Sequence, residues 1–383
     1  MGTVTFPSWP ALEAEDLDAV HRVLQSSRLS QISSSAVRDF EDAFAAYHGS
    51  KHCVAMSSGT SAVHAALAAL DIGPGDQVIV PSHTFIGSAS PILYQRADPI
   101  FGDVDERSYC LSLTSLRSLL TPRTKAIIAV HLNGHPAQMD EILTEANHHG
   151  IHVIEDVAQA VGASFKGKKV GTFGRVSCFS FWEDKIITMG GEGGAILTDE
   201  DQVAARVRRI RNNGEEKSQQ TGLYSSHELG YNYRLTAMQA ALGLCQLGRL
   251  DDYVAARRRN ATRLSAGLSG VDAIATATES SECRHVYWKY VCRLRHETLQ
   301  AATSTFVAKL QEQGIPAFQR YPVPLHRQPV FANYGHGGQV CPTSDRLAEE
   351  LFSLPVHPAL ADHHIDYMVQ TVHKIAKGHL TAL

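Results

Sequence analysis

Lys185 is the residue of this sequence best placed for covalent chemistry with a carbonyl compound. It lies in the segment FSFWEDKIITMGGEGG (179–194), where apolar side chains stand on both sides of it. Apolar neighbours desolvate an ammonium group and lower its pKa, and a neutral amine is the nucleophile that Schiff-base formation requires. Most lysines are simply exposed at protein surfaces, so this segment alone leaves a surface role open.

Two further segments carry residue types that bind charged ligands. In EDVAQA (155–160), Asp156 stands where a short strand is expected to end, a place from which a carboxylate can meet a cationic ligand atom. In SSGTSA (57–62), Gly59 and Thr60 stand at an expected helix start, whose unpaired backbone N–H groups bind anions such as phosphate. Both segments keep a structural alternative, because Asp, Ser and Thr also serve as plain helix caps.

The order of the three segments is more informative than any one of them. An anion-binding turn is followed by an acid, and the shielded lysine comes 29 positions after that acid. Each lies at, or just past, the end of an expected strand, and ligands gather at the carboxyl ends of strands in open α/β sheets. The combination favours one shared ligand site over three unrelated structural roles.

The elements that must position these residues follow an α/β pattern. Between about residues 50 and 200, short apolar runs alternate with amphipathic stretches, which is typical of a parallel sheet wrapped by helices. Strands are expected at 53–56, 77–80, 126–130, 152–155, 177–181 and 195–198. Helices are expected after the first strand and at 115–120, 139–148, 200–212 and 236–250.

The character of the chain changes after Asp251-Asp252. A long helix is expected over 253–268, then a β-like run over 286–294 and another helix over 303–314. The sequence therefore predicts a large α/β domain, residues 1–250 with an N-terminal helical segment, and a smaller C-terminal α+β domain, residues 251–383.

Bulk composition describes an ordinary globular protein and disfavours several classes of partner. A net charge of −4 gives no reason to expect nucleic acid, and the arginine clusters at 206–211 and 257–263 are interpreted as solvated helix faces. Seven scattered cysteines indicate free thiols, and neither a signal peptide nor a membrane-spanning stretch is visible, so a cytoplasmic protein is expected. The histidine doublets at 148–149 and 363–364 match no metal-ligand motif, so no metal is expected.

Together these segments resemble the DegT/DnrJ/EryC1/StrS family of sugar aminotransferases, within the fold type I (aspartate aminotransferase-like) enzymes that use pyridoxal 5′-phosphate (PLP). The similarity runs from about Val23 to the end of the chain. It rests on seven motifs: MSSGTSAVHAAL (56–67), VIVPSHTF (78–85), HLNGHPAQMD (131–140), EDVAQAVGASFKGKKVGTFG (155–174), FSFWEDKIITMGGEGG (179–194), LGYNYRLTAMQAALGLCQL (229–247) and VPLHRQPVF (323–331). The resemblance implies a large domain with a mostly parallel seven-stranded sheet between helices.

The resemblance also implies roles for individual residues. Lys185 would hold PLP as a Schiff base, and Asp156 would pair with the protonated pyridine nitrogen. Further cofactor contacts are implied at Gly59, Thr60 and Ser180 (phosphate), Phe85 and Ala158 (the two ring faces), Gln159 (ring hydroxyl) and Asn232 (phosphate of the neighbouring subunit). The role implied for Asn232 in turn implies a homodimer with active sites shared across its interface.

The implied reaction moves an amino group from L-glutamate or L-glutamine to a nucleotide-linked keto-sugar, with pyridoxamine phosphate as intermediate. The implied pathways are those of antibiotic, glycan or secondary-metabolite biosynthesis. An alternative is an aminotransferase or aromatase for a cyclitol or aminohydroxybenzoate precursor. The opening FPSWP (6–10) favours that alternative, whereas PLHRQPVF (324–331) favours the sugar-nucleotide branch.

Other classes fit the sequence less well. Relatives with histidine in place of the lysine perform dehydration, which Lys185 disfavours, and a PLP-binding sensor would need a DNA-binding module for which the chain has no room. An enzyme of amino-acid elimination or decarboxylation would need an anchored carboxylate site, for which Arg320 is available. Two departures from the family pattern lie toward the substrate: SQISSSAVRDFE (30–41) lacks the usual glycine turn, and Glu183-Asp184 precedes the lysine.

Overall fold

A seven-stranded sheet forms the centre of the computed structural model, which describes residues 4–218, 221–299 and 301–378. Its order is β1-β9-β8-β5-β4-β2-β3. The strands are β1 (His52–Met56), β2 (Gln77–Pro81), β3 (Asp98–Gly102), β4 (Thr124–Val130), β5 (His152–Asp156), β8 (Val176–Ser180) and β9 (Gly194–Thr198). The other six strands run in one direction, and β9 alone runs in the opposite direction. The mostly parallel α/β architecture implied by the resemblance is confirmed.

The six expected strands are present, and the seventh, β3, was missed. Every residue of β2, β8 and β9 is buried, as expected for strands that helices cover on both faces. The sequence of β3, DPIFG, begins with a proline dipeptide and lies at the sheet edge, where proline is tolerated. Its composition therefore gives no strand signal of its own.

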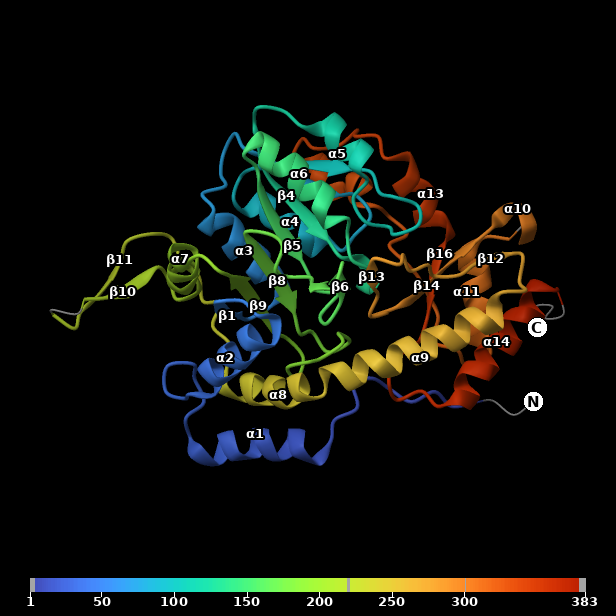
Figure 1. Cartoon of the computed structure of the whole chain (residues 1–383), viewed down its shortest axis with the longest axis horizontal. Helices are drawn as coiled ribbons and strands as arrows, with labels where there is room; N and C mark the ends of the chain where they lie inside the picture. Colours follow the sequence, from blue (N-terminus) through green and yellow to red (C-terminus); the bar gives the residue numbers. More distant parts are fainter. Residues whose placement is uncertain (1–3, 219–220, 300, 379–383) are drawn as a thin grey trace.

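Helices cover both sides of this sheet (Figure 1), with α5 and α6 on one side and α2 and α8 on the other. The outermost helix, α1, packs along α8. The helices are α1 (Ala14–Ser26), α2 (Ala36–His48), α3 (Gly59–Ala69), α4 (Ser90–Tyr94), α5 (Leu113–Leu119), α6 (Met139–His149), α7 (Asp201–Arg211), α8 (Ala237–Gly248) and α9 (Leu250–Leu268).

The C-terminal part builds a second hydrophobic core around the four-stranded antiparallel sheet β12-β14-β16-β15. Its elements are β12 (Ile274–Ala275), β14 (Tyr290–Leu294), β15 (Phe318–Gln319), β16 (Leu351–Leu354), α10 (His296–Leu299), α11 (Thr303–Glu312), α12 (Pro329–Asn333), α13 (Pro342–Glu350) and α14 (Asp362–Ala376). The strand expected over 286–294 begins only at Tyr290, because the residues before it turn toward the larger core. Phe6, from the N-terminal end, packs against this second core, and α9 has residues in both cores. The domain boundary expected at residue 250 therefore stays a prediction.

Two small sheets complete the fold. Strands β6 (Ser164–Phe165), β7 (Lys168–Lys169) and β13 (Cys283–Arg284) form one, and it ties the C-terminal part to the loop after β5. The other is a hairpin of β10 (Glu215–Lys217) and β11 (Tyr224–Ser226), which projects away from the body (Figure 1).

The interpretation of both arginine clusters as solvated faces is wrong for one member of each. Arg211 is buried and pairs with Glu41 at 2.6 Å. Arg257 is only 1% exposed, and its Nη1 donates to the carbonyl of Trp288 at 3.1 Å. An acid contacts the first guanidinium group and a backbone carbonyl the second, and the charge pattern of a single helix does not reveal either contact.

Candidate active site

A cavity of about 710 Å³ opens at the carboxyl ends of the central strands, between the sheet and the C-terminal part. Eight of the nine predicted site residues line it: Gly59, Thr60, Phe85, Asp156, Ala158, Gln159, Ser180 and Lys185. The ninth, Asn232, is exposed outside this cavity, near the base of the hairpin. The structure thus brings together residues from four well-separated parts of the sequence.

One end of the cavity is the N-terminus of α3. Ser58 caps this helix, and its hydroxyl accepts a hydrogen bond from the N–H of Ser61 at 3.1 Å. The N–H groups of Gly59 and Thr60 have no acceptor within the described part of the chain, as is usual in the first turn of a helix. A Cβ on Gly59 would lie 2.7 Å from the Cβ of Ser180, so only glycine permits this approach. The arrangement suits an anionic group such as phosphate.

Asp156 supplies a fixed carboxylate at the end of β5. The side chain of Ser88 donates to its Oδ2 at 2.7 Å, and the backbone N–H of Ala158 donates to its Oδ1 at 3.0 Å. Asp156 is 6% exposed and faces the cavity, so it can pair with a cationic ring nitrogen there. Sequence reasoning missed Ser88, whose one signal is its place three residues after Phe85.

Lys185 lies in the loop after β8, with its Nζ 4.0 Å from the centre of the Trp288 ring. Burial lowers the pKa of this amine to about 7, while the carboxylate of Asp156 opposes the shift and the charge of Arg320 adds to it. The indole N–H of Trp9 donates to the carbonyl of Lys185 at 2.9 Å and fixes the loop. A large neutral fraction near pH 7 makes this amine nucleophilic.

The opposite wall of the cavity comes from the C-terminal part. Tyr321 accepts a hydrogen bond from the Nε2 of Gln159 at 2.9 Å, and the Oε1 of Gln159 accepts from the N–H of Asn133 at 2.8 Å. The backbone of Tyr321 is held at φ +46°, in the left-handed region that side chains rarely adopt. Neither Tyr321 nor Trp288 was expected in the site, because only the tertiary fold brings them there.

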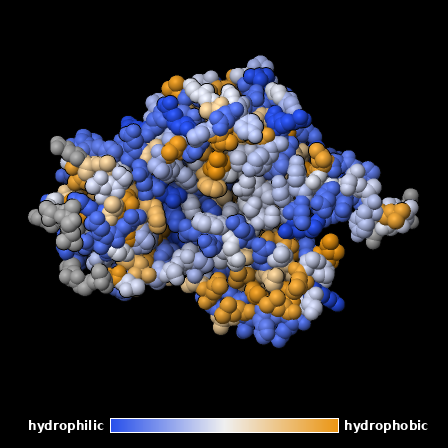
Figure 2. Space-filling model, turned by 180° about the vertical axis from the view of Figure 1, so that it is seen from behind, coloured by the Kyte–Doolittle hydropathy of each residue, from blue (hydrophilic) through white to orange (hydrophobic). Residues whose placement is uncertain are grey.

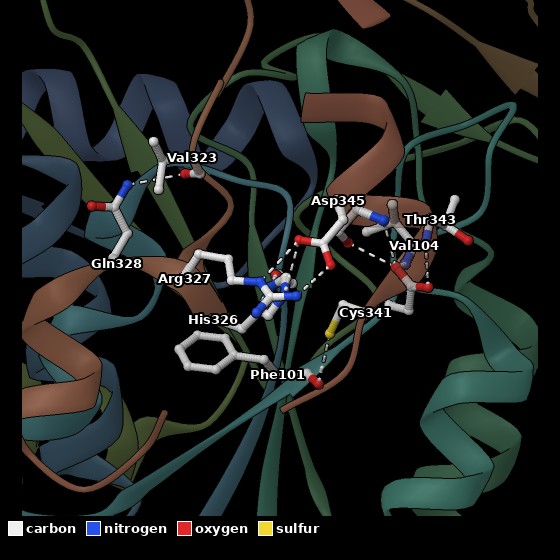
Figure 3. Close-up of polar contacts among 12 residues, drawn as sticks. Phe101, Val104, Val323, His326, Arg327, Gln328, Cys341, Thr343 and Asp345 are labelled. Atoms are coloured by element: carbon white, nitrogen blue, oxygen red, sulfur yellow. Dashed lines mark hydrogen bonds and ion pairs between the residues drawn. The ribbon is translucent and has the colours of Figure 1, made fainter. Parts of the chain in front are cut away.

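A polar cluster with a buried and an exposed end anchors this wall (Figure 3). The Nδ1 of His326 lies 2.5 Å from the hydroxyl of Ser82, which directly follows β2, and its Nε2 lies 3.1 Å from the Oδ1 of Asp345. Arg327 pairs with the other oxygen of Asp345 at 2.9 Å. These contacts join the segment that carries Tyr321 to the segment that carries Phe85, so they hold two walls of the cavity together.

The donor set fits PLP in kind: N–H donors for a phosphate, a carboxylate for a protonated ring nitrogen, and a nucleophilic amine for an aldehyde. An α/β fold with this sheet order and with such a cavity at its carboxyl edge defines a PLP-dependent transferase of fold type I.

Comparison with known proteins identifies the family. The signature of the DegT/DnrJ/EryC1/StrS aminotransferase family matches residues 10–373. The chain is 39% identical over 375 residues to GDP-perosamine synthase of Caulobacter vibrioides, covering 96% of each chain. It is 38% identical to UDP-N-acetyl-3-dehydro-alpha-D-glucosamine 3-aminotransferase of Acidithiobacillus ferrooxidans, covering 96% of this chain and 95% of that one.

Solved structures agree. An aminotransferase from Psychrobacter cryohalolentis superposes with a TM-score of 0.92 at 33% identity, covering 97% of this chain and 99% of that one. Streptomyces venezuelae DesV, in complex with a ketimine intermediate, gives a TM-score of 0.88 at 35% identity over 95% of both chains. The chain belongs to the DegT/DnrJ/EryC1/StrS aminotransferase family, and it is an aminotransferase of the PLP-dependent kind.

Among the described residues, no three His, Cys, Asp or Glu side chains gather as ligands for a metal ion would. Nor does any helix in those ranges have the length and apolar character needed to cross a membrane.

Proposed function

We propose that this aminotransferase moves an amino group from L-glutamate or L-glutamine to a nucleotide-linked keto-sugar, with PLP held covalently on Lys185. The observation that carries the proposal is the buried Lys185 amine, with a pKa of about 7, in one cavity with the fixed carboxylate of Asp156. The substrate class rests on the relatives, of which GDP-perosamine synthase and the 3-aminotransferase above are two.

Each residue has a defined task in this reaction. PLP, when bound, delocalises the electron pair left on the substrate carbon after that carbon loses its proton. The carboxylate of Asp156 keeps the ring nitrogen protonated, because an adjacent negative charge raises the pKa of a cationic acid. The amine of Lys185, when free, would carry the proton between the substrate carbon and the cofactor carbon. Gly59, Thr60 and Ser180 would hold the phosphate at the N-terminus of α3.

The working unit is a homodimer in which Asn232 reaches the phosphate site of the neighbouring subunit. Apolar side chains remain exposed on the hairpin connection, where Leu223 is 70% and Leu229 is 86% exposed. Apolar surface also gathers over α1 (Figure 2), where Leu17 and Leu24 point outward. Exposed apolar patches mark protein contacts, and the projecting hairpin supports a contact with a second copy.

All seven cysteines are unpaired, which supports a cytoplasmic location.

A second candidate acceptor is a cyclitol or aminohydroxybenzoate precursor. The structure of 3-amino-5-hydroxybenzoic acid synthase superposes with a TM-score of 0.90 at 28% identity, covering 98% of this chain and 99% of that one. The higher identity to sugar-nucleotide enzymes favours the keto-sugar.

Spectroscopy of the two half-reactions tests the proposal. Purified protein with PLP should show the absorbance of a cofactor bound to lysine, and L-glutamate or L-glutamine should convert it to the pyridoxamine form. Nucleotide-linked keto-sugars, and not keto-cyclitols, should then restore the first spectrum. Lys185→Ala should retain the cofactor non-covalently and lose turnover. A wild-type protein that takes up no PLP, or a Lys185→Ala variant with full turnover, contradicts the proposal.

A further inference from the structure

The cavity holds a second primary amine besides that of Lys185. Lys289 also lines it, and both lysines lie against one indole ring, with Nζ atoms 4.0 Å (Lys185) and 5.2 Å (Lys289) from the centre of Trp288. Burial lowers the pKa of both amines. An aldehyde bound in this cavity therefore faces two candidate nucleophiles, and a reaction that runs through one of them needs a means of selection.

The two lysines differ in their partners. The Nζ of Lys289 donates to the Oδ2 of Asp184 at 2.5 Å, whereas no carboxylate of the described residues lies within ion-pair distance of Lys185. The carboxylate of Asp184 opposes the effect of burial on Lys289 and favours its protonated form. A protonated amine has no lone pair and cannot attack a carbonyl carbon.

Asp184 is itself held in place. Its backbone carbonyl accepts a hydrogen bond from the indole N–H of Trp288 at 2.6 Å, and it directly precedes Lys185 in the chain. One ring thus positions the carboxylate that binds Lys289 and the amine of Lys185 together. Asp184 also raises the pKa of Lys185, although it forms an ion pair only with Lys289. The other charged groups that act are Asp156 and Lys289 on Lys185, Arg257 on Lys289, and Arg320 on both.

We propose that Asp184 selects the attachment site of the cofactor, by holding Lys289 as an ammonium ion and leaving Lys185 as the reactive amine. This inference rests on the proposed function. In the covalent step, the neutral amine of Lys185 attacks the aldehyde carbon and forms a C–N bond. The carbonyl oxygen leaves as water with the two protons that the nitrogen gives up, so no oxidant or reductant is needed. Lys289 takes no part while its proton stays on.

Borohydride trapping with PLP followed by peptide mass spectrometry tests the selection directly, without a measure of turnover. The reagent adds hydride to the C=N carbon and makes the attachment permanent. We expect wild-type label on Lys185 and only background label on Lys289 in Lys185→Ala. In Lys185→Ala/Asp184→Asn, label on Lys289 should rise about tenfold or more, the ratio that one pKa unit represents. Asp184→Asn alone, which keeps Lys185, should carry label on both lysines.

Two matched variants separate the role of the carboxylate from general damage. Lys185→Ala/Asp184→Glu keeps a carboxylate and should return Lys289 to background label. Lys185→Ala/Glu183→Gln neutralises the adjacent, exposed acid and should also leave Lys289 unlabelled. Equal label on Lys289 in Lys185→Ala and in Lys185→Ala/Asp184→Asn, or no label on Lys289 in the second of these, overturns this inference and leaves the proposed function standing. A wild-type protein that binds no PLP contradicts the proposed function instead.

Discussion

Replacing Lys185 by methionine in the cofactor-free protein should stabilise it, by an amount that depends on pH. Lys185 is 9% exposed, and burial lowers the pKa of its amine to about 7. The unfolded chain binds the same proton with a pKa of about 10.4. Folding therefore costs free energy whenever the pH requires the amine to be charged in the unfolded chain. Methionine has a similar length and carries no charge, so it removes this cost while it fills the same space.

The magnitude follows from the difference between the two pKa values. The two pKa values differ by about 3.4, and at about 1.36 kcal/mol per pKa unit this difference corresponds to a penalty of about 4 to 5 kcal/mol below pH 7. The folded pKa lies below the unfolded one, so wild-type protein regains this free energy as the pH rises from about 7 toward about 10. The advantage of Lys185→Met should thus be full at pH 6 and should shrink to about 2 kcal/mol at pH 9.

Urea unfolding of both cofactor-free proteins between pH 6 and pH 9.5 measures this difference. Lys125→Met, at an exposed position, serves as the matched control and should change the free energy of unfolding by less than about 0.5 kcal/mol at every pH. A difference between wild type and Lys185→Met that stays constant with pH refutes the reasoning. So does a wild-type protein that is the more stable one at pH 6, because either result means that the amine keeps an ordinary pKa.

Two further substitutions test the walls of the cavity. Gly59→Ala places a Cβ 2.7 Å from that of Ser180, so the dissociation constant of PLP should rise at least about tenfold in an equilibrium titration, whereas Gly73→Ala, where a Cβ meets nothing within 4 Å, should leave it unchanged. His326→Ala leaves the buried hydroxyl of Ser82 without its partner and should lower the free energy of unfolding by about 1 to 3 kcal/mol. Arg327→Ala, at the exposed end of the same cluster, should cost less than about 1 kcal/mol, and equal losses in the two variants would contradict the role given to His326.

The parts of the site that the sequence predicts are those that one short segment encodes completely. The turn at Gly59 is such a case, because its anion-binding N–H groups and its cap all lie within SSGTSA. Asp156 is another, since the end of an apolar run already places it at the carboxyl edge of a sheet. The burial of Lys185 is likewise predicted by the apolar residues close to it in the sequence.

The remaining contacts need partners that lie far along the chain. Trp288 stands 103 residues from Lys185, in a run that reads as a strand and is extended only from Tyr290. Arg257 looks like one of several helix-surface arginines until the carbonyl of Trp288 is placed beside it. No periodicity within one element distinguishes such residues, because their burial is decided by packing between elements.

The residues suited to the cofactor and the residues that line the rest of the cavity come from different parts of the fold. The groups suited to the phosphate and the ring nitrogen come from α3 and from the strand ends of the central sheet, each within one short segment of the sequence. The walls beyond Lys185 come from Trp288, Lys289, Arg320 and Tyr321, and the fold holds them there through contacts such as Lys289 to Asp184. Trp288 and Tyr321 also contact Lys185 and Gln159, which are assigned to the cofactor, so changes at Lys289 and Arg320 bear more directly on what lies next to the reacting amine. Acceptor identity is therefore better tested by substitutions at Lys289 and Arg320 than by the degree of identity to any one relative.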